Sequence, residues 1–119
     1  MLKKAETLQQ TLIDSGFSWS THKNAFAKHQ EEINELKEAI DHDESHDRLL
    51  EEYGDCLFSL INIGCRLNLD SNVALDIAIQ KYEKRTSYLY SKASKLGVDF
   101  SSVHLETLLV WWKEAKDNV

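Results

Sequence analysis

Apolar residues recur every three or four positions through most of the chain, and this period predicts helices rather than strands. The 119 residues contain only four glycines and no proline, so little interrupts the helices and they are expected to be long. Helices are expected over about 4–14, from a cap at Ser20 or Thr21 to about 41, over about 45–67 and 71–96, and in a short C-terminal segment. The pattern predicts an all-α bundle of four to five helices that forms one domain, 1–119.

In the second expected helix, four apolar residues follow the helical period and form one stripe: Phe26, Ile33, Leu36 and Ile40. We expect this stripe to be the apolar face of the helix. The small residues Ala25 and Ala39 lie on a flank with Lys28, Glu32 and Glu35, where they would let a partner helix approach closely.

The third expected helix is apolar almost all round between Cys56 and Cys65, which predicts that it is the central and most buried helix. A single polar stripe crosses it, made of Glu52, Asp55, Ser59, Asn62 and Arg66. Buried polar groups are costly unless they are satisfied, so the stripe either meets polar partners or lines a ligand cavity. A small domain has few helices to cover so apolar an element, so a homodimer or higher homo-oligomer is expected, with this helix in or next to the interface.

The net charge of −6 argues against a protein that binds duplex nucleic acid, because such a protein needs a basic surface to neutralise phosphates. No signal peptide is evident, and no apolar run approaches the ~18 residues of a membrane span. Cys56 and Cys65 stand nine positions apart in one helix, too far to form a disulfide. Two free thiols are typical of a reducing cytoplasm.

Two pairs of acidic residues stand three positions apart, Glu32 with Glu35 and Glu52 with Asp55. Residues at this spacing share one face of a helix, so antiparallel packing of the second and third helices can bring the pairs face to face. Four carboxylates repel one another unless a cation lies between them. Because hard divalent cations prefer oxygen ligands, the spacing predicts a site for Mg²⁺, with Mn²⁺ as the alternative.

Other polar groups support less specific interpretations. The Asp- and His-rich run 41–47 is typical of a solvated loop that caps helix ends. Lys81 and Arg85, one helical turn apart, are either a surface pair or two cations placed for phosphate oxygens. A di-iron site of the ferritin type is disfavoured, since no glutamate has a histidine three residues on. The two cysteines lie in an apolar helix, which disfavours a thiolate nucleophile.

Several motifs together resemble the MazG-type nucleoside triphosphate pyrophosphohydrolases, of the all-α NTP pyrophosphatase superfamily. The family signature Glu-Glu-x-x-Glu, followed after a spacer by Glu-x-x-Asp, is matched at 31–35 and 52–55. Four further segments resemble the family pattern: Gly-Phe-Ser-Trp at 16–19, Gly-Asp-Cys-Leu-Phe at 54–58, Lys-Tyr-Glu-Lys-Arg at 81–85, and the closing segment 105–116. The resemblance covers nearly the whole chain and matches the C-terminal copy of the two domains that fuller family members carry.

The resemblance implies that Mg²⁺ is held by Glu32, Glu35, Glu52 and Asp55, with Glu31 as a candidate supporting acid. It also implies contacts with the phosphates or the nucleotide from Lys81, Arg85, Lys28, Asn62 and Trp112. The implied reaction is hydrolysis of a (deoxy)nucleoside triphosphate to a monophosphate and pyrophosphate in the cytoplasm.

The chain departs from the family pattern at Ile79, where the family often has Asn, and at Cys65-Arg66, where it tends to have Arg-His. These departures concern contacts with the nucleotide and leave the metal site unchanged. Two alternatives stay open: a non-catalytic helical interaction module of the same fold, and a pyrophosphatase restricted to dUTP, dCTP or a damaged nucleotide.

Overall fold

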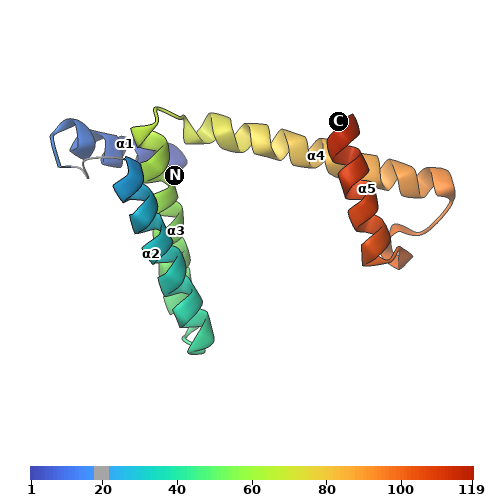
Figure 1. The fold of residues 1–119 in the computed structure, drawn as a ribbon, viewed down its shortest axis with the longest axis horizontal. Coiled ribbons are helices and arrows are strands. Elements are labelled where there is room, and N and C mark those ends of the chain that lie inside the picture. Colours follow the sequence, from blue (N-terminus) through green and yellow to red (C-terminus); the bar gives the residue numbers. More distant parts are fainter. Residues whose placement is uncertain (18–21) are drawn as a thin grey trace. The chain divides into compact units, whose positions relative to one another are not determined.

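The computed structural model describes residues 1–17 and 22–119, and this part of the chain forms helices and no strands, which confirms the all-α class (Figure 1). The elements are α1 (Leu2–Asp14), α2 (His22–Asp41), α3 (His46–Arg66), α4 (Ser71–Leu96), the 3₁₀ turn η1 (Phe100–Ser102) and α5 (Leu105–Asn118). The caps expected for α2 at Ser20 and Thr21 lie outside the described residues. None of the described helices combines the length and the apolar character that crossing a membrane requires. The chain divides into two compact units, Met1–Asn72 and Val73–Val119.

The helix ends follow local sequence signals. The side chain of Ser45 accepts a hydrogen bond from the backbone N–H of Arg48 and so caps α3, because a helix leaves its first N–H groups without partners. Helix α4 ends at Leu96, and Gly97 follows with a φ of 67°, a left-handed conformation that glycine adopts without steric cost. The run 41–47 is exposed along its whole length, but only 42–45 form the turn between the helices, because 41 ends α2 and 46–47 begin α3.

In the first unit, α2 and α3 run side by side as an antiparallel hairpin, and α1 packs against α3 (Figure 1). The buried positions of α2 are Ala25, Glu32 and Ala39, seven residues apart and therefore on one face. The apolar stripe expected for α2 is only partly covered, because Ile33 and Leu36 are half-buried whereas Phe26 and Ile40 are 51% and 54% exposed. Close approach of α3 requires small side chains, so the alanines rather than the larger apolar residues determine the packed face.

Helix α3 is the central helix of this unit, as expected, since both α1 and α2 pack on it. It also has more buried residues than any other helix in the described part of the chain, which confirms that it is the most buried one. Its polar stripe turns inward, with Glu52, Ser59 and Asn62 all buried, while Leu57 and Leu60 on another face are 46% and 53% exposed. The helix therefore has exposed apolar side chains on one face, whereas its buried positions combine polar Glu52, Ser59 and Asn62 with apolar Ile61, Ile63 and Cys65.

The buried polar stripe of α3 finds polar partners. Nδ1 of His29 lies 2.7 Å from Oγ of Ser59, which donates its own hydrogen to the carbonyl of Cys56. The Ser59 hydroxyl thus lies between the imidazole of His29 and the carbonyl of Cys56 and has polar partners on both sides. On α1, the buried Glu6 carboxylate accepts a hydrogen bond from the backbone N–H of Ser71, the first residue of α4. These contacts offset the cost of burying polar groups on α3 and α1.

In the second unit, α5 packs on the C-terminal half of α4 through a small core of Leu89, Ala93 and Trp111. Partly buried apolar side chains surround this core: Phe100, Val103, Leu108 and Trp112. Beside it, the Glu114 carboxylate accepts hydrogen bonds from the Lys92 ammonium and from the Tyr88 hydroxyl. The ammonium also lies 5.6 Å from the centre of the Trp111 ring, within the range of a cation–π contact.

We expect Glu114→Gln to lower the melting temperature at pH 7 and to change it little at low pH. The hydrogen bond from Lys92 holds the pKa of Glu114 below its usual value. A carboxyl group with a lowered pKa in the folded state stabilises the fold fully at pH values above its unfolded-state pKa of about 4.3. This contribution is lost as the pH falls through the folded-state pKa. Thermal melts between about pH 3 and pH 7 would measure the effect, with Glu83→Gln at an exposed position of α4 as the control. Equal behaviour of the two variants would contradict a stabilising role of Glu114.

Candidate metal centre and adjoining pocket

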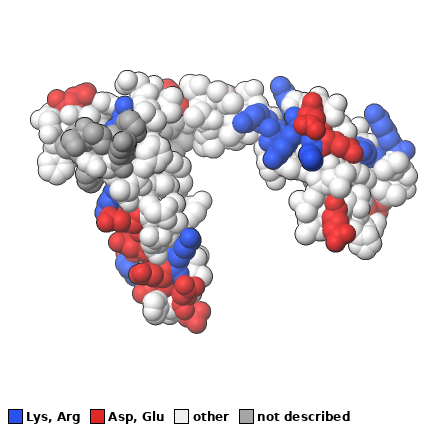
Figure 2. Space-filling model, in the orientation of Figure 1, with Lys and Arg blue, Asp and Glu red and all other residues white. Residues whose placement is uncertain are grey.

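Three carboxylates from two helices converge in the first unit. Glu32 of α2 faces Glu52 and Asp55 of α3, and one ligand atom from each lies within 4.8 Å of the others. The antiparallel hairpin brings these residues together, because acids three apart on α3 share the face that packs against α2. We call this group the acidic cluster. Acidic side chains also gather along α2 and α3 toward the turn that joins the two helices (Figure 2).

Each buried acid of the cluster has one oxygen in an ion pair. Lys28 Nζ lies 3.0 Å from Glu32 Oε1, and Arg48 Nη2 lies 2.6 Å from Glu52 Oε1. The second oxygens, Oε2 of Glu32 and Oε2 of Glu52, are buried and have no hydrogen-bond partner among residues 1–17 and 22–119. Buried unsatisfied carboxylate oxygens are costly, and a hard divalent cation with oxygen ligands would satisfy both. The donor set therefore fits Mg²⁺ or Mn²⁺.

The other two acids of the α2 motif lie beside the acidic cluster rather than in it. Glu35 is exposed, and the charge of Glu32 raises its pKa above the ordinary value. Glu31 is exposed, and its Oε2 lies 3.5 Å from Nζ of Lys28. Of the four ligands that the sequence predicts, the structure brings Glu32, Glu52 and Asp55 together, and Asp55 is exposed like Glu35. The role of all four as metal ligands stays a prediction.

A pocket of about 250 Å³ adjoins the acidic cluster and lies among α1, α2 and α3. Two acids of the cluster, Glu32 and Asp55, contribute to its wall, as do the predicted substrate residues Lys28 and Asn62. The remaining lining is mostly apolar and comes from Leu8, Leu12, Ile13, Phe17, Ala25 and Phe58, together with Gln9, Ser59 and Arg66. The polar stripe of α3 thus has both of the roles that the sequence left open, since it meets polar partners and lines a cavity.

Sequence reasoning missed Gln9, which is 7% exposed and lines the pocket from α1. Its side chain accepts a hydrogen bond from Asn62 and donates one to the backbone carbonyl of Phe58. The available signal was weak, because two glutamines, Gln9 and Gln10, stand between Leu8 and Leu12 and only one of them lies on the packed side of the helix. A polar residue on such a side is a candidate for a buried hydrogen-bonding role.

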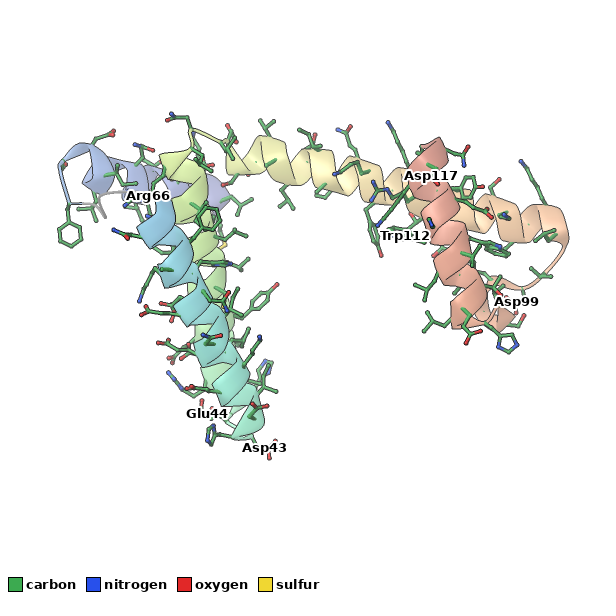
Figure 3. All side chains as sticks on the ribbon, viewed as in Figure 1. Asp43, Glu44, Arg66, Asp99, Trp112 and Asp117 are labelled. Carbon is green, nitrogen blue, oxygen red and sulfur yellow. The ribbon has the colours of Figure 1, made fainter. Side chains whose placement is uncertain are left out.

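The predicted phosphate-binding residues belong to the second compact unit. Lys81 is exposed, whereas Arg85 is half-buried and has its guanidinium carbon 5.9 Å from the centre of the Trp112 ring. Nε of Arg85 is buried without a hydrogen-bond partner in the part of the chain that the structure describes. The Tyr82 ring lies 5.8 Å from the Trp112 ring. Trp112, which projects from α5 toward α4 in Figure 3, thus contacts the guanidinium of Arg85 through a cation–π interaction.

Comparison with known proteins agrees with the motifs. The model of the MazG nucleotide pyrophosphohydrolase domain matches residues 20–90. The chain is 35% identical over 115 residues to the nucleoside triphosphate pyrophosphohydrolase/pyrophosphatase MazG of Thermotoga maritima, and 31% identical over 116 residues to the nucleoside triphosphate pyrophosphohydrolase of Escherichia coli K12. Each alignment covers 97% of this chain and 44% of the relative, so the chain spans less than half the length of these relatives. The chain belongs to the MazG nucleotide pyrophosphohydrolase family.

Proposed function

We propose that this protein hydrolyses (deoxy)nucleoside triphosphates to the monophosphate and pyrophosphate in the presence of Mg²⁺. The observation that carries the proposal is the pair of buried, unsatisfied oxygens on Glu32 and Glu52, beside Asp55 and next to a pocket. Triphosphates bind divalent cations through their phosphate oxygens. A cation held by the carboxylates would therefore also bind the phosphates of the substrate. Family membership supports the same reaction class.

Glu32, Glu52 and Asp55 would hold the cation, with Glu35 as the fourth predicted ligand. A divalent cation bound there supplies a Lewis acid for the phosphoryl oxygens and lowers the pKa of a bound water. Lys28 and Arg48 keep one oxygen of each buried acid in an ion pair, so the side chains are oriented before a substrate arrives. This preorganisation limits the cost of rearranging the carboxylates during the reaction.

Lys81 and Arg85 would stabilise negative charge on the phosphates. Both are cations on successive turns of α4, and a guanidinium can bind phosphate oxygens in a bidentate manner. The contact with Trp112 restrains the Arg85 side chain, which lowers the entropy lost when it binds a phosphate.

Assays with a panel of nucleoside triphosphates and Mg²⁺ test the proposal. We expect release of pyrophosphate rather than orthophosphate, and loss of turnover after removal of the cation with a chelator. Orthophosphate as the first product would contradict cleavage between the α and β phosphates. No turnover with any of the triphosphates would instead favour a non-catalytic helical module.

A cytoplasmic location agrees with the state of the two cysteines. Cys56 and Cys65 are both free thiols. Burial is the main cause that raises the pKa of each, and the carboxylates around the acidic cluster add to the rise for Cys56. Both groups are therefore neutral thiols at pH 7, which a reducing compartment keeps free of disulfides.

We also propose a homodimer or higher homo-oligomer that uses the outer face of α3. Tyr53, Leu57 and Leu60 share this face and are 57%, 46% and 53% exposed. Covering such apolar groups with a second copy stabilises the assembly by about 25 cal/mol per Å² of apolar area removed from water. A two-fold contact is the commonest arrangement for such a surface.

Light scattering is expected to give a mass of at least twice the 13.7 kDa chain. The double variant Leu57→Lys, Leu60→Lys is expected to shift the mass toward the monomer, because two buried charges in an apolar interface are costly. Asn34→Arg, at an exposed polar position of α2, is the control and should leave the mass unchanged. A fully active wild-type protein at the monomer mass would contradict the proposal.

A further inference from the structure

A hydrogen bond between side chains links α2 to α3 about one helical turn from the acidic cluster. Nδ1 of His29 lies 2.7 Å from Oγ of Ser59. His29 is half-buried and Ser59 is 8% exposed, so water competes little for this contact. The same Oγ lies 3.0 Å from the carbonyl oxygen of Cys56. The contact therefore connects the imidazole of α2 to a hydroxyl that is held against the backbone of α3.

The hydrogen bond and the acidic cluster lie on the same faces of α2 and α3. Glu32 follows His29 by three residues on α2. Asp55 precedes Ser59 by four residues on α3. Residues at these spacings share one face of a helix, and α2 and α3 are antiparallel (Figure 1), so both steps lead in the same direction. A shift of one helix along the other that breaks the His29 contact would therefore also displace Glu32 relative to Asp55.

The ion pairs around the acidic cluster do not join the two helices. Lys28 pairs with Glu32 four residues further along α2. Arg48 pairs with Glu52 four residues further along α3. Each cation belongs to the same helix as its carboxylate, so the pairs orient the acids but do not resist a shift of one helix along the other.

The other groups at this helix contact give little directional restraint. Ala25 and Ala39, the buried alanines of α2, offer methyl groups whose apolar contacts are not directional. The carboxylates of Glu32, Glu52 and Asp55 repel one another when no cation lies between them, so they tend to separate the helices. A hydrogen bond, in contrast, weakens steeply when its length or angle changes. The contact from His29 to Ser59 is therefore suited to fix the register.

We propose that His29 is a positioning residue for the acidic cluster. Through Ser59 it fixes the register of α2 on α3, and this register sets the distances among the three carboxylates. The inference rests on the cation site of the proposed function. Mg²⁺ requires oxygen ligands in nearly ideal octahedral positions, so a small error in the register weakens binding. Loss of an interaction that orients a metal ligand lowers metal affinity by about 10- to 100-fold.

Binding of Mn²⁺ to the metal-free protein tests the proposal without any turnover, because the EPR signal of unbound Mn²⁺ reports the affinity. We expect His29→Leu to weaken Mn²⁺ binding by at least about tenfold. Leucine has a carbon at the position of Nδ1, so it keeps much of the bulk and removes the hydrogen bond. Leucine also has a higher helix propensity than histidine, so a weaker helix would not explain the loss.

A conservative variant and a matched control accompany this substitution. The amide of His29→Asn has a nitrogen and an oxygen one bond beyond Cγ, as Nδ1 is, so it can donate to Ser59 or accept from it. We expect its Mn²⁺ affinity to lie close to the wild-type value. His42→Leu is the control, because His42 is exposed and its Nδ1 lies 2.7 Å from the carbonyl oxygen of Glu38, four residues earlier in the chain. This variant should bind Mn²⁺ as the wild-type protein does.

The partner substitution Ser59→Ala should cause the same loss of Mn²⁺ affinity as His29→Leu. The double variant should bind Mn²⁺ no more weakly than either single variant, because both substitutions remove the same hydrogen bond. Losses that multiply in the double variant would overturn the proposal, as would wild-type Mn²⁺ affinity in a folded His29→Leu protein. A purely structural role of His29 would lower the melting temperature and leave the Mn²⁺ affinity of the folded protein unchanged. If His29→Leu does not fold, Ser59→Ala decides the matter.

The Mn²⁺ titrations separate this inference from the proposed function. Mn²⁺ binding that depends on His29, in a protein that hydrolyses no triphosphate, would support the positioning role and contradict the enzyme activity. Hydrolysis together with Mn²⁺ affinity that does not depend on His29 would support the activity and contradict the positioning role. A wild-type protein that binds no Mn²⁺ would contradict both.

Discussion

Glu52→Gln is expected to lower kcat/KM for nucleoside triphosphates by about 1000-fold, the effect of losing several kcal/mol of transition-state stabilisation. Glu52 is 5% exposed, and its Oε2 is one of the two unsatisfied oxygens of the acidic cluster. An amide at this position keeps the size of the side chain and removes the negative charge that a divalent cation needs. Steady-state assays of pyrophosphate release measure the effect.

The folded state should survive this substitution. In metal-free buffer the carboxylates of Glu32, Glu52 and Asp55 repel one another, so removing one charge relieves repulsion. The lost ion pair with Arg48 opposes this gain, but Arg48 keeps Glu51 as a partner at 2.8 Å. We expect a melting temperature that is unchanged or higher without metal, together with a large loss of Mn²⁺ affinity.

Glu51→Gln is the matched control, because Glu51 pairs with the same arginine and is exposed. It removes one negative charge from the neighbouring position of α3 and leaves the acidic cluster intact. Activity and Mn²⁺ affinity should stay near the wild-type values. Near-normal turnover in folded Glu52→Gln, or an equal loss in Glu51→Gln, would refute the assignment of Glu52 as a metal ligand.

Arg85→Ala is expected to have the second largest effect, a loss of about 100-fold in kcat/KM with Mn²⁺ affinity nearly intact. The estimate corresponds to the loss of a charge-assisted, bidentate contact with phosphate, about 3 kcal/mol. Lys81→Ala should act in the same direction with a smaller effect, since an ammonium makes a point-charge contact. Kinetic assays and Mn²⁺ titrations of each variant measure the two properties separately.

Two further variants distinguish the charge of Arg85 from its packing. Arg85→Met keeps an apolar side chain against Trp112, so it should lose as much activity as Arg85→Ala while melting closer to the wild-type protein. Lys84→Ala removes a neighbouring exposed cation of α4 and should change activity little. A large fall in Mn²⁺ affinity in either Arg85 variant would mean that Arg85 acts on the acidic cluster and not on the phosphates.

The sequence by itself determined the helices, their ends and the spacing of the acidic pairs. These properties depend on interactions within a few residues of one another. The expected ranges agree with the structure to within a residue or two for α1 and α3, and the span 71–96 agrees for α4, because Ser45 and Gly97 act locally on the backbone. The pairing of Glu52 with Asp55 follows from helical geometry alone.

Only the tertiary structure decided which face of each helix is buried. Periodicity shows that Phe26 and Ile40 share a stripe of α2. The close packing of α2 on α3 instead buries Ala25 and Ala39, because their small side chains let the helices approach. The same helix pairing buries Glu32, leaves Glu35 exposed and brings Glu32 to Glu52 and Asp55. Burial depends on the shape of the partner helix, which is absent from the periodicity of any single segment.

The role of Gln9 is also a product of the tertiary structure. Its partner Asn62 is 53 residues away in the chain, and no local pattern relates two positions at that distance. The inward turn of the polar stripe on α3 has the same origin, because hydrogen bonds to α1 and α2 offset the burial of Asn62 and Ser59. Local propensity specifies helices and candidate ligands, whereas the pocket and its buried hydrogen bonds exist only where three helices meet.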